Sequence, residues 1–295
     1  MTLAQDVIAF GLYTAALVAI GAVGFTLQFG ITNVLNLAFG STLTSAIFVD
    51  RWVAGGNPSA WLAILIGGVW GALFSWLIGR FVVNAFVRRG TSLFGMAMVT
   101  IALGLIIQFT LEGIQGPTIL SYNVAQNHVF HIGAVAMSDL QLTIIGCAAA
   151  ALVMVHLLLR YTKLGLAMRA TAADADLSRG CGIPTQRVRT IAWLVSGALC
   201  GICGVFLGIS TGSFDSTIGG SIFITIAAAA IIGGIGKPYG AMVGALIVGL
   251  AGETAAAVLS PSYKDVVAWA ILIAVLILRP QGIFAEFASD RQLVQ

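Results

Sequence analysis

Long apolar runs, separated by short polar breaks, constrain the fold of this chain more than any other feature. A hydrocarbon core about 30 Å thick needs roughly 20 apolar residues for each helical span, and only helices or closed barrels satisfy their backbone polar groups in lipid. These runs are too long and too unalternating for barrel strands. They lie at residues 7–29, 34–49, 61–83, 93–111, 140–159, 188–209, 222–236, 241–259 and 266–278. The sequence therefore predicts an all-α, polytopic membrane helix bundle.

Composition agrees with a chain that meets lipid over most of its surface. Only 8% of the residues are charged and 59% are apolar, whereas about a quarter of a soluble domain is charged. The runs 34–49 and 222–236 are short and interrupted by glycine, so we expect eight or nine spans, some of them short or broken. Because these spans use most of the chain, residues 1–295 are expected to form a single transmembrane domain. The first span has no basic region before it, so it does not resemble a cleavable signal peptide.

Basic residues are distributed unevenly between the two sides that the span order defines. Of the 14 Lys and Arg residues, all but Arg51 and Lys264 fall in segments on one side. Because cytoplasmic loops carry an excess of Lys and Arg, that side is expected to be cytoplasmic. It holds the loop at residues 161–187 and the C-terminus. The segment 112–139 contains no Lys or Arg and is expected to be an external loop.

Ionisable residues inside a bilayer usually mark a pathway, and this chain has almost none in mid-span. Glu112, Asp215 and Glu253 all fall at predicted span ends. His156 is the one intramembrane candidate, and a packed or interfacial role is favoured over a proton relay. This pattern argues against a transporter that couples itself to a proton gradient, although sodium coordinated by backbone carbonyls stays open.

Neither a catalytic set nor metal-ligand spacing is visible in the sequence. The run at 233–238 superficially resembles a phosphate loop, but Ile231 replaces its first glycine and Pro238 replaces the hydroxyl that would bind Mg²⁺. We therefore expect no enzymatic activity, no metal site and no cofactor on this chain.

Glycine is concentrated in the spans, and much of it recurs at intervals of four residues. Such spacing places small residues on one helix face, where they permit close helix packing. Helix sliding during a transport cycle is compatible with the same pattern. The glycines expected to pack helices together are Gly40, Gly233, Gly234, Gly236, Gly240 and Gly244.

The loop at 161–187 is the longest segment on the predicted cytoplasmic side. Residues 164–179 are rich in the helix formers Ala and Leu, and Gly180, Gly182 and Pro184 are expected to end that helix. Its small residues and flanking charges suit docking into a groove on a partner protein. An amphipathic helix on the membrane surface is the weaker reading, because Phe, Trp and a broad cationic face are missing.

Four segments, in order along the chain, resemble the permeases of branched-chain amino acid ABC transporters. The segment 164–183 resembles the cytoplasmic coupling loop of that family. The short first block and the overall length of the chain resemble the LivH-type subunit more than the longer LivM-type. The other three segments are Asn36-Leu-Ala38-Phe39-Gly40, residues 233–241, and Leu278-Arg279-Pro280-Gln281-Gly282-Ile283-Phe284. The matches extend from about residue 20 to residue 284, over nearly the whole chain.

This resemblance implies the permease subunit of an importer in the bacterial cytoplasmic (inner) membrane. Its implied partners are a second, LivM-type permease, two cytoplasmic ATPase subunits that carry ATP and Mg²⁺, and a periplasmic solute-binding protein. No nucleic-acid partner is implied. Branched-chain or related small amino acids would cross by alternating access. The residues implied to couple transport to the ATPases are Arg169, Ala170, Ala172, Asp174, Asp176, Ser178 and Gly182.

Departures from the family pattern leave the solute open. Phe39 stands where His is usual, Ser41 where an acidic residue is common, and Ser178 where Ala is usual. The family also includes permeases for urea, amides and other small organic solutes. The polar groups at lipid depth are equally well explained by capping or helix–helix hydrogen bonds. The candidates for the substrate path are Asn33, Asn36, Phe39, Ser213 and Thr217.

A function from a different class is a self-sufficient secondary transporter or channel for a small solute. It would use an ion or solute gradient and need no ATPase partner. Uptake by the chain alone in liposomes would favour it, whereas co-elution with an ATPase and a second permease would favour the ABC importer.

Overall fold

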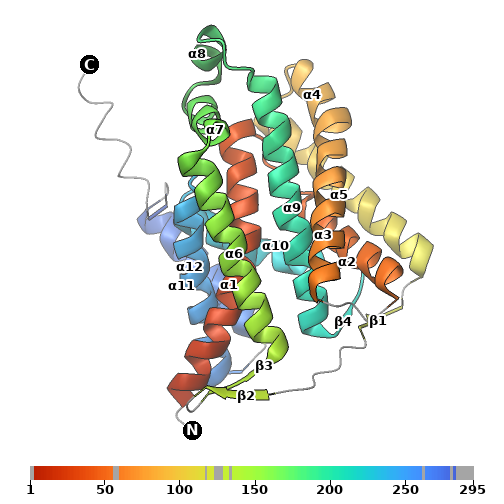
Figure 1. Cartoon of the computed structure of the whole chain (residues 1–295), viewed down its shortest axis with the longest axis vertical. Helices are drawn as coiled ribbons and strands as arrows, with labels where there is room; N and C mark the ends of the chain where they lie inside the picture. Colours follow the sequence, from red (N-terminus) through yellow and green to blue (C-terminus); the bar gives the residue numbers. More distant parts are fainter. Residues whose placement is uncertain are drawn as a thin grey trace.

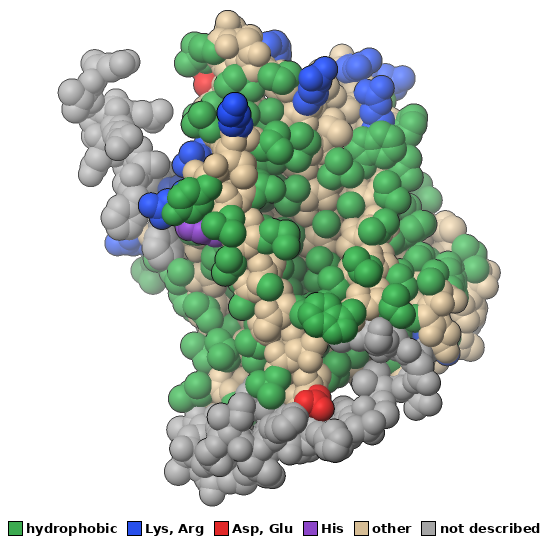
Figure 2. Space-filling view, viewed as in Figure 1, with side chains coloured by type: hydrophobic (Ala, Val, Ile, Leu, Met, Phe, Trp, Pro, Cys, Tyr) green, Lys and Arg blue, Asp and Glu red, His purple; other side chains and the backbone are tan. Residues whose placement is uncertain are grey.

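The structure is a computed structural model that describes residues 3–55, 60–116, 118–122, 129–132, 135–260, 263–279 and 282–283. Its helices form one bundle with two different ends (Figure 1). One end carries the short helices α4 (Asn84–Arg88), α7 (Lys163–Ala173) and α8 (Ala175–Gly180). Figure 2 shows Lys and Arg side chains gathered there, so we call it the basic end. The opposite end, called the strand end, carries β1 (Leu120–Ser121), β2 (Val129–Ile132), β3 (Val135–Ser138) and β4 (Ser213–Phe214).

Each of the nine apolar runs forms a helix. Within the described residues, six stretches are long and apolar enough to cross a membrane. They are α1 (Leu3–Thr32), the continuous α3 (Ala60–Leu77), η1 (Ile78–Val83) and α4, then α5 (Leu93–Gln115), α6 (Asp139–Tyr161), α9 (Thr185–Thr211) and α11 (Pro238–Val258). The shorter ones are α2 (Phe39–Ala54), α10 (Ile218–Gly233) and α12 (Lys264–Leu278). The predicted all-α membrane bundle is confirmed, and the chain is a multi-pass membrane protein.

Helices α1 and α9 form the centre of the bundle, and more exposed helices such as α5 and α6 lie outside them. In the most apolar 18-residue stretch of each helix, 61% of the residues of α1 and 72% of those of α9 are buried, against 22% for both α5 and α6. Figure 2 shows hydrophobic side chains over the flank between the two ends. α5 and α6 therefore present apolar surface outward, as helices that face lipid or another membrane subunit do.

Glycine brings α3 and α9 into backbone contact. Gly71 approaches Gly201 so closely that a Cβ on Gly71 would lie 2.8 Å from the Gly201 Cα atom. Gly67 and Gly197 extend the same contact, four residues away on each helix. Small residues at this spacing let membrane helices pack by van der Waals contact, where no hydrophobic drive operates between them.

The glycines singled out from the sequence lie at two further close contacts. A Cβ on Gly40 would lie 2.5 Å from the Gly219 carbonyl oxygen, so α2 and α10 begin against each other. Gly233 and Gly240 place their backbones in contact, and Gly244 lies against Ala229. Gly234 and Gly236 form the turn between α10 and α11 with positive φ values of 101° and 86°, which favour glycine.

The predicted helix at 34–49 is wrong at its beginning, because α2 starts at Phe39. Asn33 has a φ of +52° and ends α1 in the left-handed conformation. The residues between the helices satisfy their backbone through α5. The buried Thr100 hydroxyl accepts a hydrogen bond from the Leu37 amide at 3.2 Å and donates to the Leu35 carbonyl at 3.0 Å. Irregular backbone at this depth is stable where protein groups replace water.

At the strand end, Tyr122 holds α2 to the segment that follows α5. Its hydroxyl lies 2.9 Å from the carboxylate of Asp50, which is fully buried. Burial and this carboxylate raise the pKa of Tyr122 above its ordinary range, so the phenol stays protonated and donates. Nearby, β1 pairs antiparallel with β4, with Ser121 opposite Ser213. This pairing was not predicted.

The turn before α11 also contacts the end of the described chain. Gly282, with a φ of +85°, packs against Gly234, and the Ile283 amide donates to the Ile232 carbonyl at 2.9 Å. Two of the four family-like segments, 233–241 and 278–284, therefore meet in space. Pro280, Gln281 and Phe284 lie outside the described residues.

Candidate functional site

The segment at the basic end forms two short helices, where the sequence predicted one. Thr162 begins α7 by accepting a hydrogen bond from the Gly165 amide at 3.0 Å. Gly165 lies against the carbonyls of Leu158 and Leu159, which permits the sharp turn from α6. Asp174 is extended and caps α8, accepting from the amides of Asp176 and Leu177, both at 2.9 Å. The expectation of a single helix through residue 179 is wrong, because this cap starts a new one.

The two helices bury one face and expose the other. Met168 and Thr171 of α7 and Ser178 of α8 are buried against the bundle. Ala170 is half-buried, and Gly182 ends the segment with a φ of +83°. The exposed members of the predicted coupling set are Arg169, Ala172, Asp174, Asp176 and Gly182. Most of that set therefore lies on one accessible surface, which we call the coupling surface.

An exposed apolar side chain completes the coupling surface. Leu177, which directly follows Asp176 in α8, is 67% exposed. The Asp176 and Arg179 side chains beside it pair at 3.4 Å, both largely in solvent. An exposed ion pair of this kind adds little stability. Because both side chains are exposed, both charges are accessible to a partner. Sequence reasoning missed Leu177, although a leucine between charged residues in a short helix is a signal for a docking contact.

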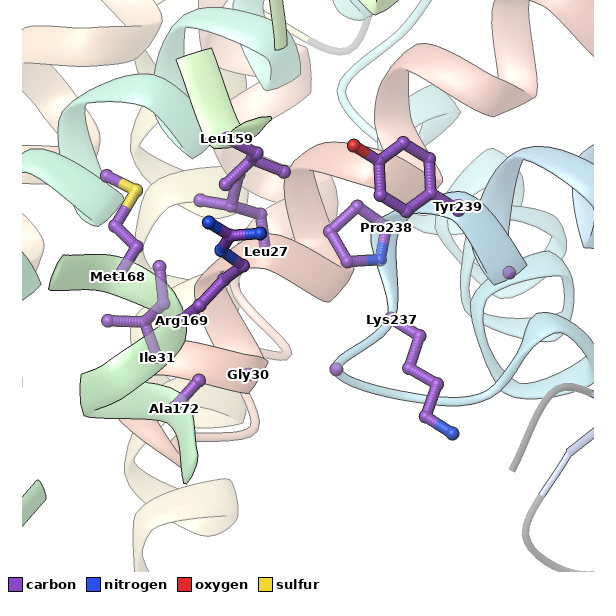
Figure 3. Close-up of a pocket in the computed structure, with 12 residues that line it drawn as sticks. Leu27, Gly30, Ile31, Leu159, Met168, Arg169, Ala172, Lys237, Pro238 and Tyr239 are labelled. Carbon is purple, nitrogen blue, oxygen red and sulfur yellow. The ribbon is translucent and has the colours of Figure 1, made fainter. Parts of the chain in front are cut away.

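A cavity of about 400 Å³ lies directly behind the coupling surface (Figure 3). Its walls come from the end of α1, the end of α6, α7 and the turn into α11. Figure 3 shows Met168, Arg169 and Ala172 on one side and Lys237, Pro238 and Tyr239 on the other. Two predicted coupling residues, Arg169 and Ala172, therefore also line this space. We call it the basic-end cavity.

A second cavity of about 520 Å³ adjoins the first. The two share five lining residues, and the second adds the polar residues Asn33, Thr171 and Arg189. The shared residues are Gly30, Ile31, Ala172, Gly236 and Lys237. Together the two cavities form a cationic vestibule, which attracts anionic groups such as a carboxylate.

Three phenylalanines pack at the centre of the bundle, deeper than the basic-end cavity. The ring centroids of Phe25 and Phe39 are 5.7 Å apart, those of Phe25 and Phe223 are 5.5 Å apart, and those of Phe39 and Phe223 are 6.2 Å apart. We call these three residues the aromatic cluster. Next to it, the buried Gln28 accepts hydrogen bonds from Ser196 at 3.0 Å and from Asn36 at 3.5 Å.

A third cavity, of about 330 Å³, lies toward the strand end between α1, α9, α10, α11 and α12. Lys264, which lines it, forms an ion pair with Glu253. The Thr14 hydroxyl donates to the same Glu253 carboxylate at 2.6 Å. The sequence predicted Glu253 at a span end and Lys264 on the side opposite the cytoplasm. It did not predict the contact of both residues with Thr14 of α1. We call this space the strand-end cavity.

The predicted substrate-path residues do not form one site. Asn36 and Phe39 lie buried at the centre of the bundle, while Asn33 is exposed at the vestibule. Ser213 pairs with Ser121 in the strands, and the Thr217 hydroxyl donates to Asp215 at 2.9 Å. The five residues are thus spread from one end of the bundle to the other. Within the described ranges, no group of three His, Cys, Asp or Glu side chains is placed to hold a metal ion.

Comparison of the sequence with known proteins places this chain in a family. Residues 7–276 match the family described as the permease component of branched-chain amino acid transport systems. The LivH permease protein of the high-affinity branched-chain amino acid transport system of Escherichia coli K12 is 29% identical, over 91% of each chain. The corresponding BraD protein of Pseudomonas aeruginosa is 28% identical, over 94% of each chain. The probable LivH of Methanocaldococcus jannaschii is 30% identical, over 89% of this chain and 86% of its own. No solved structure matches.

Proposed function

We propose that this chain, which belongs to the permease components of branched-chain amino acid transport systems, translocates branched-chain or related small aliphatic amino acids as one subunit of an ABC importer. The single observation that carries this proposal is the coupling surface, which stands at the basic end directly against the basic-end cavity. A movement imposed on α7 would reshape that cavity, because Met168, Arg169 and Ala172 form part of its wall.

The proposed partners supply what this chain lacks. Two cytoplasmic ATPase subunits would receive the coupling surface and carry the ATP and Mg²⁺. A second, LivM-type permease would cover part of the apolar flank, and a periplasmic binding protein would deliver solute. The protein would lie in a bacterial cytoplasmic membrane with the basic end inside, as the positive-inside rule favours. Leu177 suits the ATPase contact best, since an exposed leucine between charges makes an apolar anchor with a polar rim.

The order of the cavities along α1 supports alternating access. Leu17 lines the strand-end cavity, Phe25 belongs to the aromatic cluster, and Leu27 lines the basic-end cavity. Leu17 and Leu27 are about 15 Å apart along the helix axis at 1.5 Å per residue. One helix thus contacts a cavity on each side of a packed aromatic barrier. A tilt of α1 relative to α11 would open one cavity as it closes the other.

A self-sufficient secondary transporter has weaker support. Such a protein needs an ionisable group at the membrane centre to couple solute to protons. At the centre of the bundle, the described polar groups around the aromatic cluster are the neutral Gln28, Asn36 and Ser196. Lys and Arg side chains gather instead at the basic end, where a soluble partner can reach them.

Co-purification tests the proposal. The chain, expressed with its second permease and ATPase subunits, is expected to elute as one complex. Leu177→Asp should release the ATPases and retain the second permease, because it places a charge in an apolar contact. Leu166→Asp is the matched control, since Leu166 of α7 is 62% exposed and lies outside α8. Recovery of this chain without any ATPase, from cells that make all the subunits, would contradict the proposal.

A further inference from the structure

We propose that the strand-end cavity is a binding site for the free amino acid as a zwitterion, in which Glu253 holds the α-ammonium group and Lys264 holds the α-carboxylate. This inference rests on the proposed function, because it names the chemical features of the solute that the permease recognises. Lys264 and Thr14 line this cavity, and Glu253 contacts both of them from the residue next to Gly252 in the lining.

Lys264 lines the cavity, and its ion-pair partner Glu253 lies beside it. The Glu253 side chain is 14% exposed and the Lys264 side chain is 37% exposed, so the lysine is the more accessible partner. Both contact Thr14, whose oxygen lies 3.5 Å from the Lys264 Nζ atom. The residues come from α1, α11 and α12, and a zwitterion inserted between the two charges would keep all three helices connected. Each charge would then exchange one opposite charge for another, so neither would be left unpaired.

The rest of the cavity has the character of an amino-acid site. One part of its lining is hydroxyl-bearing, from Tyr13, Thr14, Ser210, Thr211 and Thr225. The Thr225 side chain is more than nine-tenths buried, and its hydroxyl has no hydrogen-bond partner among the described residues. A buried hydroxyl without a partner costs free energy, and a polar group of a ligand that reached Thr225 would supply the missing partner. This is the second observation that points to a ligand.

The other part of the lining is aliphatic. Its members are Leu17, Leu207, Ile222, Val248 and Ala268. Ligand sites are typically apolar with a few convergent polar groups that fix orientation. An aliphatic side chain would therefore lie against these residues while its charged head met Glu253 and Lys264. The cavity volume of about 330 Å³ also suits a solute of this size better than a peptide.

In the competing explanation, the ion pair between Glu253 and Lys264 only holds α11 and α12 together. Exchanging the two charges distinguishes this explanation from a zwitterion site. The double variant Glu253→Lys with Lys264→Glu restores an ion pair, so a structural tie predicts normal stability and normal solute binding. A zwitterion site predicts normal stability with loss of binding, because the hydroxyl and aliphatic walls stay in place while the charges change sides.

Binding is measured on the assembled transporter in nanodiscs, as the ligand-dependent rise in thermal unfolding temperature. The probes are L-leucine, isocaproate, which lacks the ammonium group, and isoamylamine, which lacks the carboxylate. Wild type should respond to L-leucine alone. Loss of one charge-assisted contact should weaken apparent L-leucine affinity roughly 10- to 100-fold in Glu253→Gln and in Lys264→Met. Thr254→Ala is the matched control, because Thr254 is exposed and bonds only its own helix.

Two results would overturn the inference. One is an unchanged L-leucine response in both single variants, and the other is a normal response in the charge-exchange variant. Failure of the proposed function looks different. In that case wild-type transporter with all its partners would show no ATP-driven uptake of any amino acid, whatever residues stand at 253 and 264.

Discussion

At the scale of single residues, Asp174 decides how the coupling surface is built. It ends α7, and its carboxylate caps α8 by accepting from the amides of Asp176 and Leu177. The aspartate therefore sets the angle between the two helices and the place of Leu177. A family resemblance identified this residue, but its capping role has a local reason that would hold in any protein: a side-chain oxygen satisfies helix amides that have no intrahelical partner.

Replacing Asp174 separates its capping role from its charge. Asp174→Ala removes both hydrogen bonds, at a cost of about 1 kcal/mol to the α8 cap, and should lower the amount of solute moved for each ATP hydrolysed. Membrane insertion should be unaffected, because residue 174 is exposed outside the spans. Asp174→Asn keeps the cap and loses the charge, so it should couple far better than Asp174→Ala. ATP hydrolysis and uptake measured in the same proteoliposomes provide the ratio, and equal ratios for wild type and Asp174→Ala would refute the coupling role.

Reversing the charge of Arg169 tests the contact between the coupling surface and the basic-end cavity. Arg169 is exposed and also lines the cavity, so Arg169→Glu should reduce transport several-fold while the complex still assembles. Arg179→Glu is the comparison, since Arg179 is exposed on α8 but does not line that cavity. We expect the Arg179 variant to affect ATPase association more than solute movement. If Arg169→Glu supports normal uptake, the link between α7 and the cavity is wrong.

At the scale of elements, glycine contacts hold the central helices together. Gly201→Ala should lower the free energy of unfolding by roughly 1–3 kcal/mol, because the added methyl group would overlap the Gly67 carbonyl and force α3 away from α9. Gly146→Ala is the matched control: Gly146 is also helical, and an added Cβ there has no neighbour within 4 Å. That variant should be neutral or slightly more stable, since alanine is the better helix former. Thermal unfolding in detergent compares them, and equal midpoints would exclude glycine packing as a source of stability.

The aromatic cluster is expected to act as the barrier between the two sides. Phe223 is half-buried, so Phe223→Ala should retain the fold and still thin the barrier. Proteoliposomes that contain this variant should leak radiolabelled L-leucine without ATP, faster than wild type. Phe94→Ala, on the exposed face of α5, removes an identical ring far from the cluster and should not leak. A leak rate equal to wild type in a correctly assembled Phe223→Ala complex would show that the barrier lies elsewhere.

Local patterns predicted the elements of this fold much better than its contacts. Every apolar run contains a helix among the described residues, because length and hydropathy within one run are enough to specify a membrane helix. The start of α2 was misplaced, since the 34–38 segment depends on Thr100, more than 60 residues away in sequence. The strand-end cavity was missed for the same reason: Thr14 and Glu253 are 239 residues apart. The break at Asp174, in contrast, had a local signal in its capping residue type.

At the scale of the whole molecule, the uneven charge distribution predicts how the protein lies in its membrane. Cys181 follows α8 at the basic end and is exposed, whereas Cys200 and Cys203 are buried and Cys147 is half-buried within α6. A membrane-impermeant maleimide should therefore label Cys181 in inside-out vesicles and leave intact cells unlabelled. Cys181→Ser should abolish that labelling. Ser213→Cys, made in the Cys181→Ser background, should label only from outside, and the reverse pattern would invert the proposed topology.

The central claim is that this chain moves solute only when partner ATPases move its coupling surface. The most direct measurement is uptake of radiolabelled L-leucine into proteoliposomes that contain this chain, a second permease, the ATPase subunits and a solute-loaded binding protein. The account predicts uptake against a gradient that needs ATP, Mg²⁺ and every subunit, and less uptake for each ATP hydrolysed in Asp174→Ala. Concentrative uptake by this chain alone, driven by an ion gradient without ATPase subunits, would contradict it.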